Sequence, residues 1–265
     1  MSLSDPLPDV VPALPRAIDW NRGLTVSTPF SWLAAGWRDF SRQPGGSLLF
    51  GLALFALSAV IVVGMFQAGY DYLLFPALAS FLIIAPMFAI GLYEKSRLLE
   101  RGEPATLRAM MVVQAESRGQ ILFTGVLLAM VMLLWVRAAV LIYALFFGMV
   151  AFPGLDHIAE MLFTTPTGWA MLVVGTAVGG LFAAFAFAIS VFAIPMLLDE
   201  KRDAFTAMGS SVALVWNNLP AMLVWGAIVL VLLLLALLPG MVGLIVVFPL
   251  LGHATWHAWR AVRRP

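Results

Sequence analysis

The sequence predicts an all-α polytopic membrane protein: six transmembrane helices form three hairpins in parallel repeat, with amphipathic helices on the cytoplasmic side. Three observations carry this prediction: the composition, the apolar runs and the distribution of basic residues. The 265 residues are 62% hydrophobic and 11% charged, whereas soluble domains have about 25% charged residues. A chain this apolar needs the lipid bilayer as its solvent.

Six apolar runs are read as spans, because a transmembrane helix needs about 20 apolar residues. They are Gly46–Gln67, Tyr72–Tyr93, Ile121–Phe147, Trp169–Leu198, Pro220–Leu238 and Met241–Trp256. The last run is short, and we expect it to continue through the amphipathic turn at 253–259. We expect 1–28 to be a disordered cytoplasmic tail and 29–265 to be a single six-helix transmembrane domain.

The basic residues predict the orientation of these spans, because cytoplasmic loops carry an excess of Lys and Arg. Every Lys and Arg except Arg137 lies before the first run, between the second and third, between the fourth and fifth, or after the last. The other connections hold no basic residue. Both termini are therefore expected on the cytoplasmic side.

A repeat underlies the six runs. Each even run carries a proline near its cytoplasmic exit, namely Pro86, Pro195 and Pro249. An amphipathic segment precedes each odd run, clearly at Phe30–Phe40 and Phe205–Val215 and more weakly at Thr106–Arg118. We interpret the prolines as structural kinks, since neighbouring helices can satisfy the freed carbonyls. Parallel repeats also occur in transporters, so a transport role stays open.

Arg137 is the only charged residue well inside a run, and an intramembrane ionisable residue is a candidate for function. Counted from Ile121, rises of about 1.5 Å place it roughly 24 Å into a core of about 30 Å. It is therefore expected near the outer leaflet. An ion pair with Asp71, Asp156 or Glu160 is one interpretation, and a site for a substrate anion or lipid headgroup is the other.

His253 and His257 lie four residues apart, on one face of the sixth run. This spacing permits a transition-metal site if a third ligand is added, for example from Tyr93 or Glu94. Packing at the membrane interface is the alternative interpretation. The sequence has no Gly-rich phosphate loop, no nucleophile elbow and no cysteine. We therefore expect neither an enzyme nor a bound cofactor, and no nucleic-acid partner.

Four separated motifs resemble one known family. They are Trp32–Phe40, Gly91–Glu94 with Arg101–Pro104, Ile194–Asp199 and Gly252–His257. Together they are similar to a proteobacterial inner-membrane family, the domain of unknown function 2189, some members of which are loosely labelled putative cytochrome c oxidase proteins. The resemblance implies a bacterial inner-membrane protein with no established activity. A catalytic haem–copper subunit takes imidazole ligands for two haems and a copper, and the three histidines here are too few.

Two hypotheses for function follow. The first is a non-enzymatic accessory, assembly or scaffold component that acts through other membrane-protein subunits, which the resemblance would place near a respiratory oxidase. It rests on the missing catalytic motifs and on a small-residue face of the fourth run: Gly175, Gly179, Gly180, Ala184 and Ala188. The alternative is a small-solute or lipid transporter or binding protein built on a pseudo-threefold bundle. The contents of the bundle axis, polar and open or filled by apolar side chains, separate the two.

Overall fold

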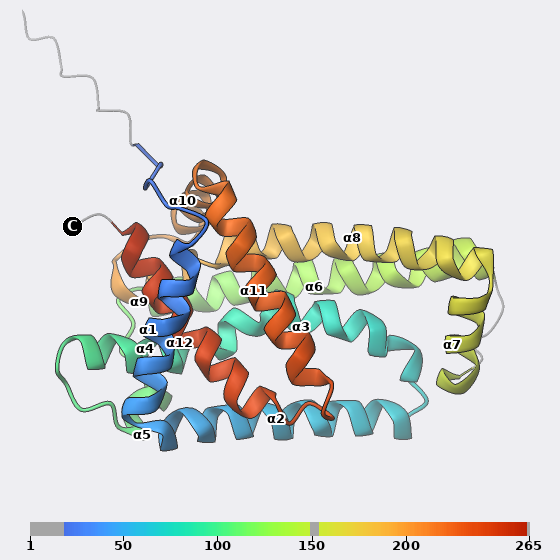
Figure 1. Ribbon diagram of the computed structural model, residues 1–265, viewed down its shortest axis with the longest axis horizontal. Helices are drawn as coiled ribbons and strands as arrows, with labels where there is room; N and C mark the ends of the chain where they lie inside the picture. Colours follow the sequence, from blue (N-terminus) through green and yellow to red (C-terminus); the bar gives the residue numbers. More distant parts are fainter. Residues whose placement is uncertain (1–18, 149–153, 264–265) are drawn as a thin grey trace, which may run out of the picture.

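The computed structural model of the protein describes residues 19–148 and 154–263, and within these ranges it has helices and no strand. The longest helices run side by side along the molecule (Figure 1). In chain order the elements are α1 Thr28–Arg42, α2 Pro44–Gln67, η1 Asp71–Leu73, α3 Leu74–Phe88, α4 Ile90–Glu100, α5 Leu107–Met111, α6 Arg118–Phe147, α7 Leu155–Thr164, α8 Pro166–Ser190, α9 Ala193–Asp199, α10 Ala204–Asn217, α11 Leu219–Leu237 and α12 Leu244–Val262.

Five helical segments of the described chain are long and apolar enough to cross a membrane. They are Pro44–Gln67, Leu74–Glu100, Arg118–Phe147, Pro166–Asp199 and Leu219–Leu237, and each overlaps one of the first five predicted runs. The sixth run corresponds to α12, which is not among them. Its second half carries His253, His257 and Arg260, and these side chains lower its mean hydropathy.

Two of the three prolines predicted as kinks lie where a long helix is interrupted. Pro86 is near the end of α3, just before α4 begins, and Pro195 is the third residue of α9, just after α8 ends. A proline has no N–H for the carbonyl four residues earlier, and its ring crowds that carbonyl, which accounts for the interruption at 191–192 before Pro195. The interruption at Ala89 instead follows Pro86, which lies inside α3. Pro249 lies inside α12, which continues past it.

A serine from α10 repairs the interruption between α8 and α9. The Phe192 N–H donates to the Ser211 hydroxyl at 3.2 Å, and that hydroxyl donates to the Ala188 carbonyl at 2.7 Å. Ser211 is fully buried. Its hydroxyl therefore satisfies two main-chain groups that would otherwise be unpaired in an apolar interior.

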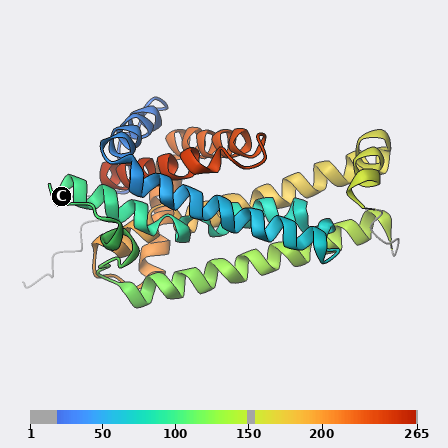
Figure 2. The same cartoon turned by 90° about the horizontal axis from the view of Figure 1, so that it is seen from below.

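Three shorter helices precede α2, α6 and α11, and each of them packs along another helix. α1 lies along α12, α5 along α4, and α10 along α8, and Figure 2 shows α1 beside α12. The contact between α1 and α12 is closest at Gly36, where a Cβ would lie 2.6 Å from the main-chain nitrogen of Ala254. No side chain fits at that crossing.

The apolar stripes predicted on α1 and α10 face largely away from the protein. Their large exposed side chains are Phe30 and Trp37 on α1 and Phe205, Val212 and Trp216 on α10. The buried faces carry small and polar residues such as Asp39 on α1 and Ser211 on α10, together with Phe40 and Val215 from the ends of the two predicted stripes. Outward apolar stripes are typical of helices that lie in the surface of a bilayer.

α7 lies in a stretch that the sequence predicted only as a connection. It packs against α8 at one end of the molecule, opposite the end that carries α9 and the end of α12 (Figures 1 and 2). Thr165 fixes the corner between the two helices. Its hydroxyl donates to the Met161 carbonyl at 2.6 Å and accepts from the Gly168 N–H at 3.0 Å.

Part of the predicted tail is held against the bundle. The Arg22 N–H donates to the side-chain oxygen of Asn218 at 2.8 Å, and the Asn218 amide donates to the Trp20 carbonyl at 2.9 Å. The Arg22 side chain also donates to the Val262 carbonyl at 2.7 Å. Residues 20–22 therefore join the turn between α10 and α11 to the end of α12, while 1–18 lie outside the described residues.

Candidate functional site

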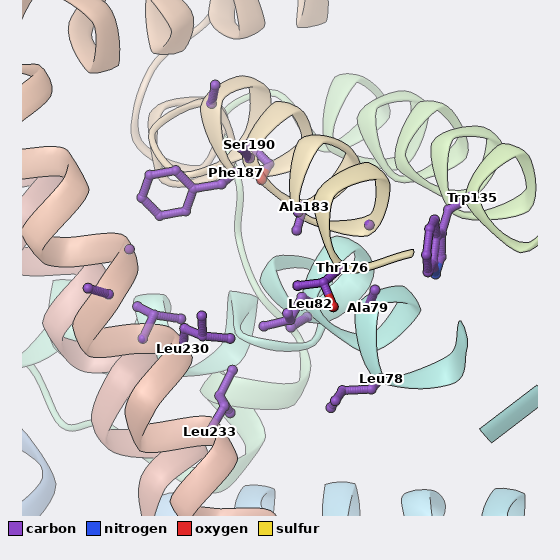
Figure 3. A pocket seen from close by; sticks show the side chains of 18 of the residues that line it. Leu78, Ala79, Leu82, Trp135, Thr176, Ala183, Phe187, Ser190, Leu230 and Leu233 are labelled. Carbon is purple, nitrogen blue, oxygen red and sulfur yellow. The ribbon is translucent and has the colours of Figure 1, made fainter. Parts of the chain in front are cut away.

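A pocket of about 860 Å³ opens between α8 and α11. α3, α6 and α12 contribute its other walls. Figure 3 shows Leu78 and Leu82 of α3, Thr176 and Ala183 of α8 and Leu230 of α11 around the same space. Among the described residues that line it, none is charged and most are aliphatic or aromatic.

Small residues keep this space open. A Cβ built at Gly175 or Gly180 of α8, or at Gly226 of α11, would meet no atom within 4 Å. At Gly179, by contrast, a Cβ would lie 2.8 Å from the Trp135 ring of α6. The small-residue face predicted on the fourth run is therefore divided: one part packs against α6, and the other part lines the pocket.

Only a few polar groups reach the pocket. The hydroxyls of Ser190 and Thr255 each donate within their own helix, to the Ala186 carbonyl at 2.6 Å and to the Leu251 carbonyl at 2.8 Å. Tyr93 of α4 is 2% exposed and also lines the pocket. Its hydroxyl makes no hydrogen bond within the described part of the chain.

The chain packs tightly next to this pocket, at the end of the molecule that carries Arg97, Arg101, Arg260 and Arg263, called here the basic end. Leu92 of α4, Phe192, Leu197 and Leu198 of the α8–α9 segment, and Trp256 of α12 are buried there. Large apolar side chains therefore pack between α4, α9 and α12 and leave no open path there.

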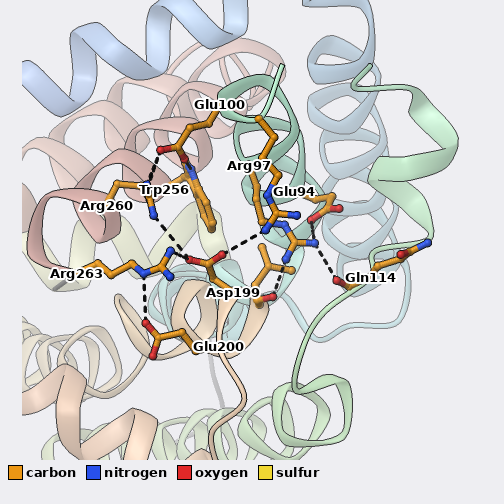
Figure 4. Close-up of polar contacts among 11 residues, drawn as sticks. Glu94, Arg97, Glu100, Gln114, Asp199, Glu200, Trp256, Arg260 and Arg263 are labelled. Carbon is orange, nitrogen blue, oxygen red and sulfur yellow. Dashed lines mark hydrogen bonds and ion pairs between the residues drawn. The ribbon is translucent and has the colours of Figure 1, made fainter. Parts of the chain in front are cut away.

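Ion pairs connect the three helices at the basic end (Figure 4). Asp199 at the end of α9 pairs with Arg263 and, at 3.7 Å, with Arg101. Glu100 of α4 pairs with Arg260 of α12 at 2.7 Å. Carboxylates and guanidinium groups from different helices thus hold the ends of α4, α9 and α12 together.

Arg97 is the buried member of this group. It pairs with Glu94 at 2.7 Å and donates to the carbonyls of Leu198 and Gln114, each at 2.8 Å. The guanidinium therefore provides hydrogen-bond donors both for a carbonyl at the end of α9 and for a carbonyl in the segment before α6. Glu94, considered above as a metal ligand, serves as the counterion of Arg97.

A second buried polar cluster joins α2, α4 and α12. Lys95, fully buried, donates to the Gln43 carbonyl at 2.6 Å and to the Ser47 hydroxyl at 2.7 Å. Ser47 lies 2.8 Å from Nε2 of His253, and the Ser96 hydroxyl lies 2.8 Å from Nδ1 of the same ring. Both ring nitrogens of His253 are thus occupied by serine hydroxyls.

The negative charge near this cluster is Asp39 of α1. Burial alone raises its pKa, but hydrogen bonds from His257 and Ser96 and the nearby imidazoles together hold the pKa below its usual value of 3.8. The contact with His257 joins Nε2 and Oδ2 at 2.7 Å. Asp39 therefore acts as the carboxylate partner of His257.

The predicted histidine pair is thus divided between two environments. His253 lies among serines and His257 against Asp39, and no group of three metal-ligating side chains occurs in the part of the chain that the structure describes. A metal at His253 would have to displace a serine hydroxyl. Metal binding by His253 and His257 stays a prediction.

Arg137 lies on α6 with its side chain exposed, and no ion pair joins it to another described side chain. Glu160 is exposed on α7. The side chains of Asp71 and Asp156 lie outside the described residues. Pairing of Arg137 with Asp71 or Glu160 therefore stays a prediction, as does a headgroup site.

The sequence reading did not single out the pocket or the roles of Lys95 and Asp39. Lys95 counted only as one more basic residue of a cytoplasmic connection. A usable signal was the composition of Tyr93–Arg97, where polar residues directly continue an apolar run without the loop that usually separates them. In the structure all five of these residues are buried.

Comparison with known proteins bears on the same part of the chain. Residues 74–199 match the model of a family described as "Predicted integral membrane protein (DUF2189)". The resemblance to this family is confirmed. The matched region runs from α3 to α9 and includes the motifs Gly91–Glu94, Arg101–Pro104 and Ile194–Asp199. No curated protein and no solved structure matches the chain.

Proposed function

We propose that this protein binds a lipid-like ligand inside the membrane, in the pocket between α8 and α11. One observation carries the proposal: an uncharged pocket of about 860 Å³ lies between helices that are apolar enough to span a bilayer. Ligand pockets commonly measure about 300–1,000 Å³ and are lined mainly by apolar side chains. The ligand would be held by its acyl or isoprenoid part.

The surroundings of the pocket support entry from the bilayer. Leu223 and Leu230 of α11 line the pocket and are also exposed on the surface of that helix, as is Trp216 of α10. Large exposed apolar side chains on a spanning helix face lipid. A ligand could therefore move sideways from the bilayer into the pocket without crossing water.

The packing between α4, α9 and α12 argues against a path for polar solutes. Such a path needs polar groups along a cavity that crosses the bundle. Phe192, Leu197 and Leu198 instead pack between these helices, beside the pocket, and ion pairs such as Glu100–Arg260 join the helix ends beyond them. Of the two branches of the transporter hypothesis, the packing therefore favours lipid binding over solute transport. We further propose that the protein performs no chemical step on the ligand.

The test is to fill the pocket. Gly180→Phe places a ring where a Cβ meets nothing within 4 Å, and Gly64→Phe does the same on the exposed surface of α2, away from the pocket. Native mass spectrometry of the purified proteins should show retained lipid with the wild type and with Gly64→Phe, and its loss with Gly180→Phe. Equal retention by all three proteins would contradict the proposal.

A second candidate function is the accessory role, which the open glycines favour. Gly175, Gly180 and Gly226 leave room for close approach by the helix of another subunit, as small residues do at helix interfaces in membranes. A protein that co-purifies in constant ratio in mild detergent and is lost on Gly180→Phe would favour this role. Retained lipid with no such protein would favour the ligand.

For the membrane arrangement we propose six spans, with α12 as the sixth, in three hairpins and with both termini in the cytoplasm of a bacterial cell. The packing of α1 on α12, α5 on α4 and α10 on α8 supports a threefold repeat. The chain has no cysteine, so single cysteines can be introduced without background. Cysteines at Gly69 and Gly240 should react with an impermeant maleimide from outside, and one at Glu103 should not.

A further inference from the structure

We infer that the pocket selects an uncharged lipid whose hydroxyl or carbonyl group hydrogen-bonds to Tyr93. This inference rests on the proposed function and adds the class of ligand. It is carried by a hydroxyl on the pocket wall that makes no hydrogen bond in the described chain, by the engagement of the neighbouring hydroxyls and by the position of the nearest charges.

Tyr93 is one of the lining residues whose polar group makes no hydrogen bond within the described chain, and Nε1 of Trp225 is another. Tyr93 lies on α4 and is 2% exposed. Nε1 of Trp225 is fully enclosed, whereas the Tyr93 hydroxyl is not among the enclosed unpaired atoms of the described chain, so a group in the pocket can reach it. Polar groups inside an apolar surrounding nearly always have a partner, and a ligand can supply the one that Tyr93 lacks. A phenol both donates and accepts, and can therefore bind a carbonyl or a hydroxyl.

The neighbouring hydroxyls limit which polar group of a ligand can bind here. Ser190 and Thr255 already donate to carbonyls of their own helices, so they can offer only lone pairs to a ligand. A ligand hydroxyl could accept from Tyr93 and donate its own hydrogen to Ser190 or Thr255, or it could donate that hydrogen to Tyr93. A ligand carbonyl could accept from Tyr93 but not from Ser190 or Thr255.

Charged headgroups find no counterion in the pocket. The charges closest to Tyr93 along α4 are Glu94, Lys95 and Arg97, and each is engaged elsewhere: Glu94 and Arg97 pair with one another, and Lys95 donates to Gln43 and Ser47. A phosphate or ammonium group would lose its hydration without an opposite charge to replace it. The lining therefore discriminates against phospholipids and favours neutral lipids.

The position of Tyr93 sets how the ligand would lie. Tyr93 follows the interruption of the α3–α4 segment and approaches the basic end, whereas Tyr72 and Phe75 line the opposite end of the pocket. The polar group of the ligand would therefore lie next to the basic end, with its chain extending along α8 and α11 toward Phe75.

The test uses the full chain in detergent and three probes of equal chain length: a diacylglycerol, a phosphatidic acid and a hydrocarbon-only analogue. Tyr93→Phe removes only the hydroxyl, and Tyr70→Phe, outside the pocket, is the matched control. The wild type should bind diacylglycerol more tightly than phosphatidic acid. Tyr93→Phe should weaken diacylglycerol binding by about fivefold, the effect of one hydrogen bond, and leave the hydrocarbon probe unchanged.

The possible failures can be told apart. Equal binding of diacylglycerol by the wild type and Tyr93→Phe, or a preference for phosphatidic acid, would overturn this inference while the pocket remained a lipid site. If none of the probes bound, or if all bound Gly180→Phe as well as the wild type, the proposed function itself would fail.

Discussion

Lys95 and Asp39 show how single charged residues are accommodated in this apolar bundle. Lys95 is fully buried and donates hydrogen bonds to the Gln43 carbonyl and the Ser47 hydroxyl. Asp39 is hydrogen-bonded to the His257 ring. His253 and its two serines lie between them. Isolated buried charges are costly, and hydrogen bonding of this kind reduces the cost. The cluster also joins α1, α2, α4 and α12, so it contributes to specifying how they pack.

Asp39 gives a prediction about pH. Because its pKa is lowered in the folded protein, the stability it contributes is present above its usual pKa of 3.8 and is lost as the pH falls through the lower folded value. Asp39→Asn should therefore cost about 1–3 kcal/mol near neutral pH, the value of a hydrogen bond to a charged group. Thermal unfolding in detergent at several pH values measures this difference.

The difference between the wild type and Asp39→Asn should shrink toward zero in acid, since the wild-type carboxyl then becomes protonated. Glu103→Gln, on an exposed turn, is the control and should change little at any pH. A deficit in Asp39→Asn that stayed constant down to about pH 2 would show that the charge of Asp39 contributes nothing.

At the scale of helices, the interruption at Pro195 depends on a side chain from another helix. Ser211→Ala would leave the Phe192 N–H and the Ala188 carbonyl without partners in a buried place. We expect a loss of about 1–3 kcal/mol in the free energy of unfolding. Ser210→Ala is the control: it removes a hydroxyl from the neighbouring position, and the Ser210 hydroxyl makes no hydrogen bond within the described chain. Equal stability of the two variants would contradict this role of Ser211.

The helices were largely predictable from the sequence, but their orientations were not. The runs around Gly46–Gln67 and Ile121–Phe147 predict spanning segments because length and hydropathy suffice for that purpose. The same apolarity cannot tell which face meets protein, since lipid is as apolar as a protein core. On α1, Gly36 and Asp39 mark the protein side, while the exposed Trp37 marks the other.

The candidate site was harder to predict than the helices. Its lining comes from α3, α6, α8, α11 and α12, and no local pattern indicates that α8 and α11 are separated by a pocket. The sequence predicts the small-residue face of α8, but small residues occur both where helices pack closely and where a pocket is open, so it does not distinguish the two. The sequence suggests Tyr93 only as a possible third metal ligand. That its hydroxyl makes no hydrogen bond is a property of the folded chain.

At the scale of the whole molecule, the described chain has a tightly joined end and an open side. Ion pairs and buried apolar residues close the basic end around α4, α9 and α12, whereas the pocket separates α8 from α11. A tightly joined end beside an open side is consistent with a protein that binds a ligand entering from the bilayer. It suits a polar channel poorly, because the space between α4, α9 and α12 is filled.

Photolabelling in native membranes can show whether lipid occupies the pocket between α8 and α11. A diazirine-bearing neutral lipid should label peptides that contain Thr176, Ala183 and Leu230, and an excess of unlabelled lipid should abolish this labelling. Labelling of the outer face of α2, for example at Val60, should persist because it is not saturable. If excess unlabelled lipid reduced the labelling of α8 and α11 no more than that of α2, the pocket would not be a specific lipid site.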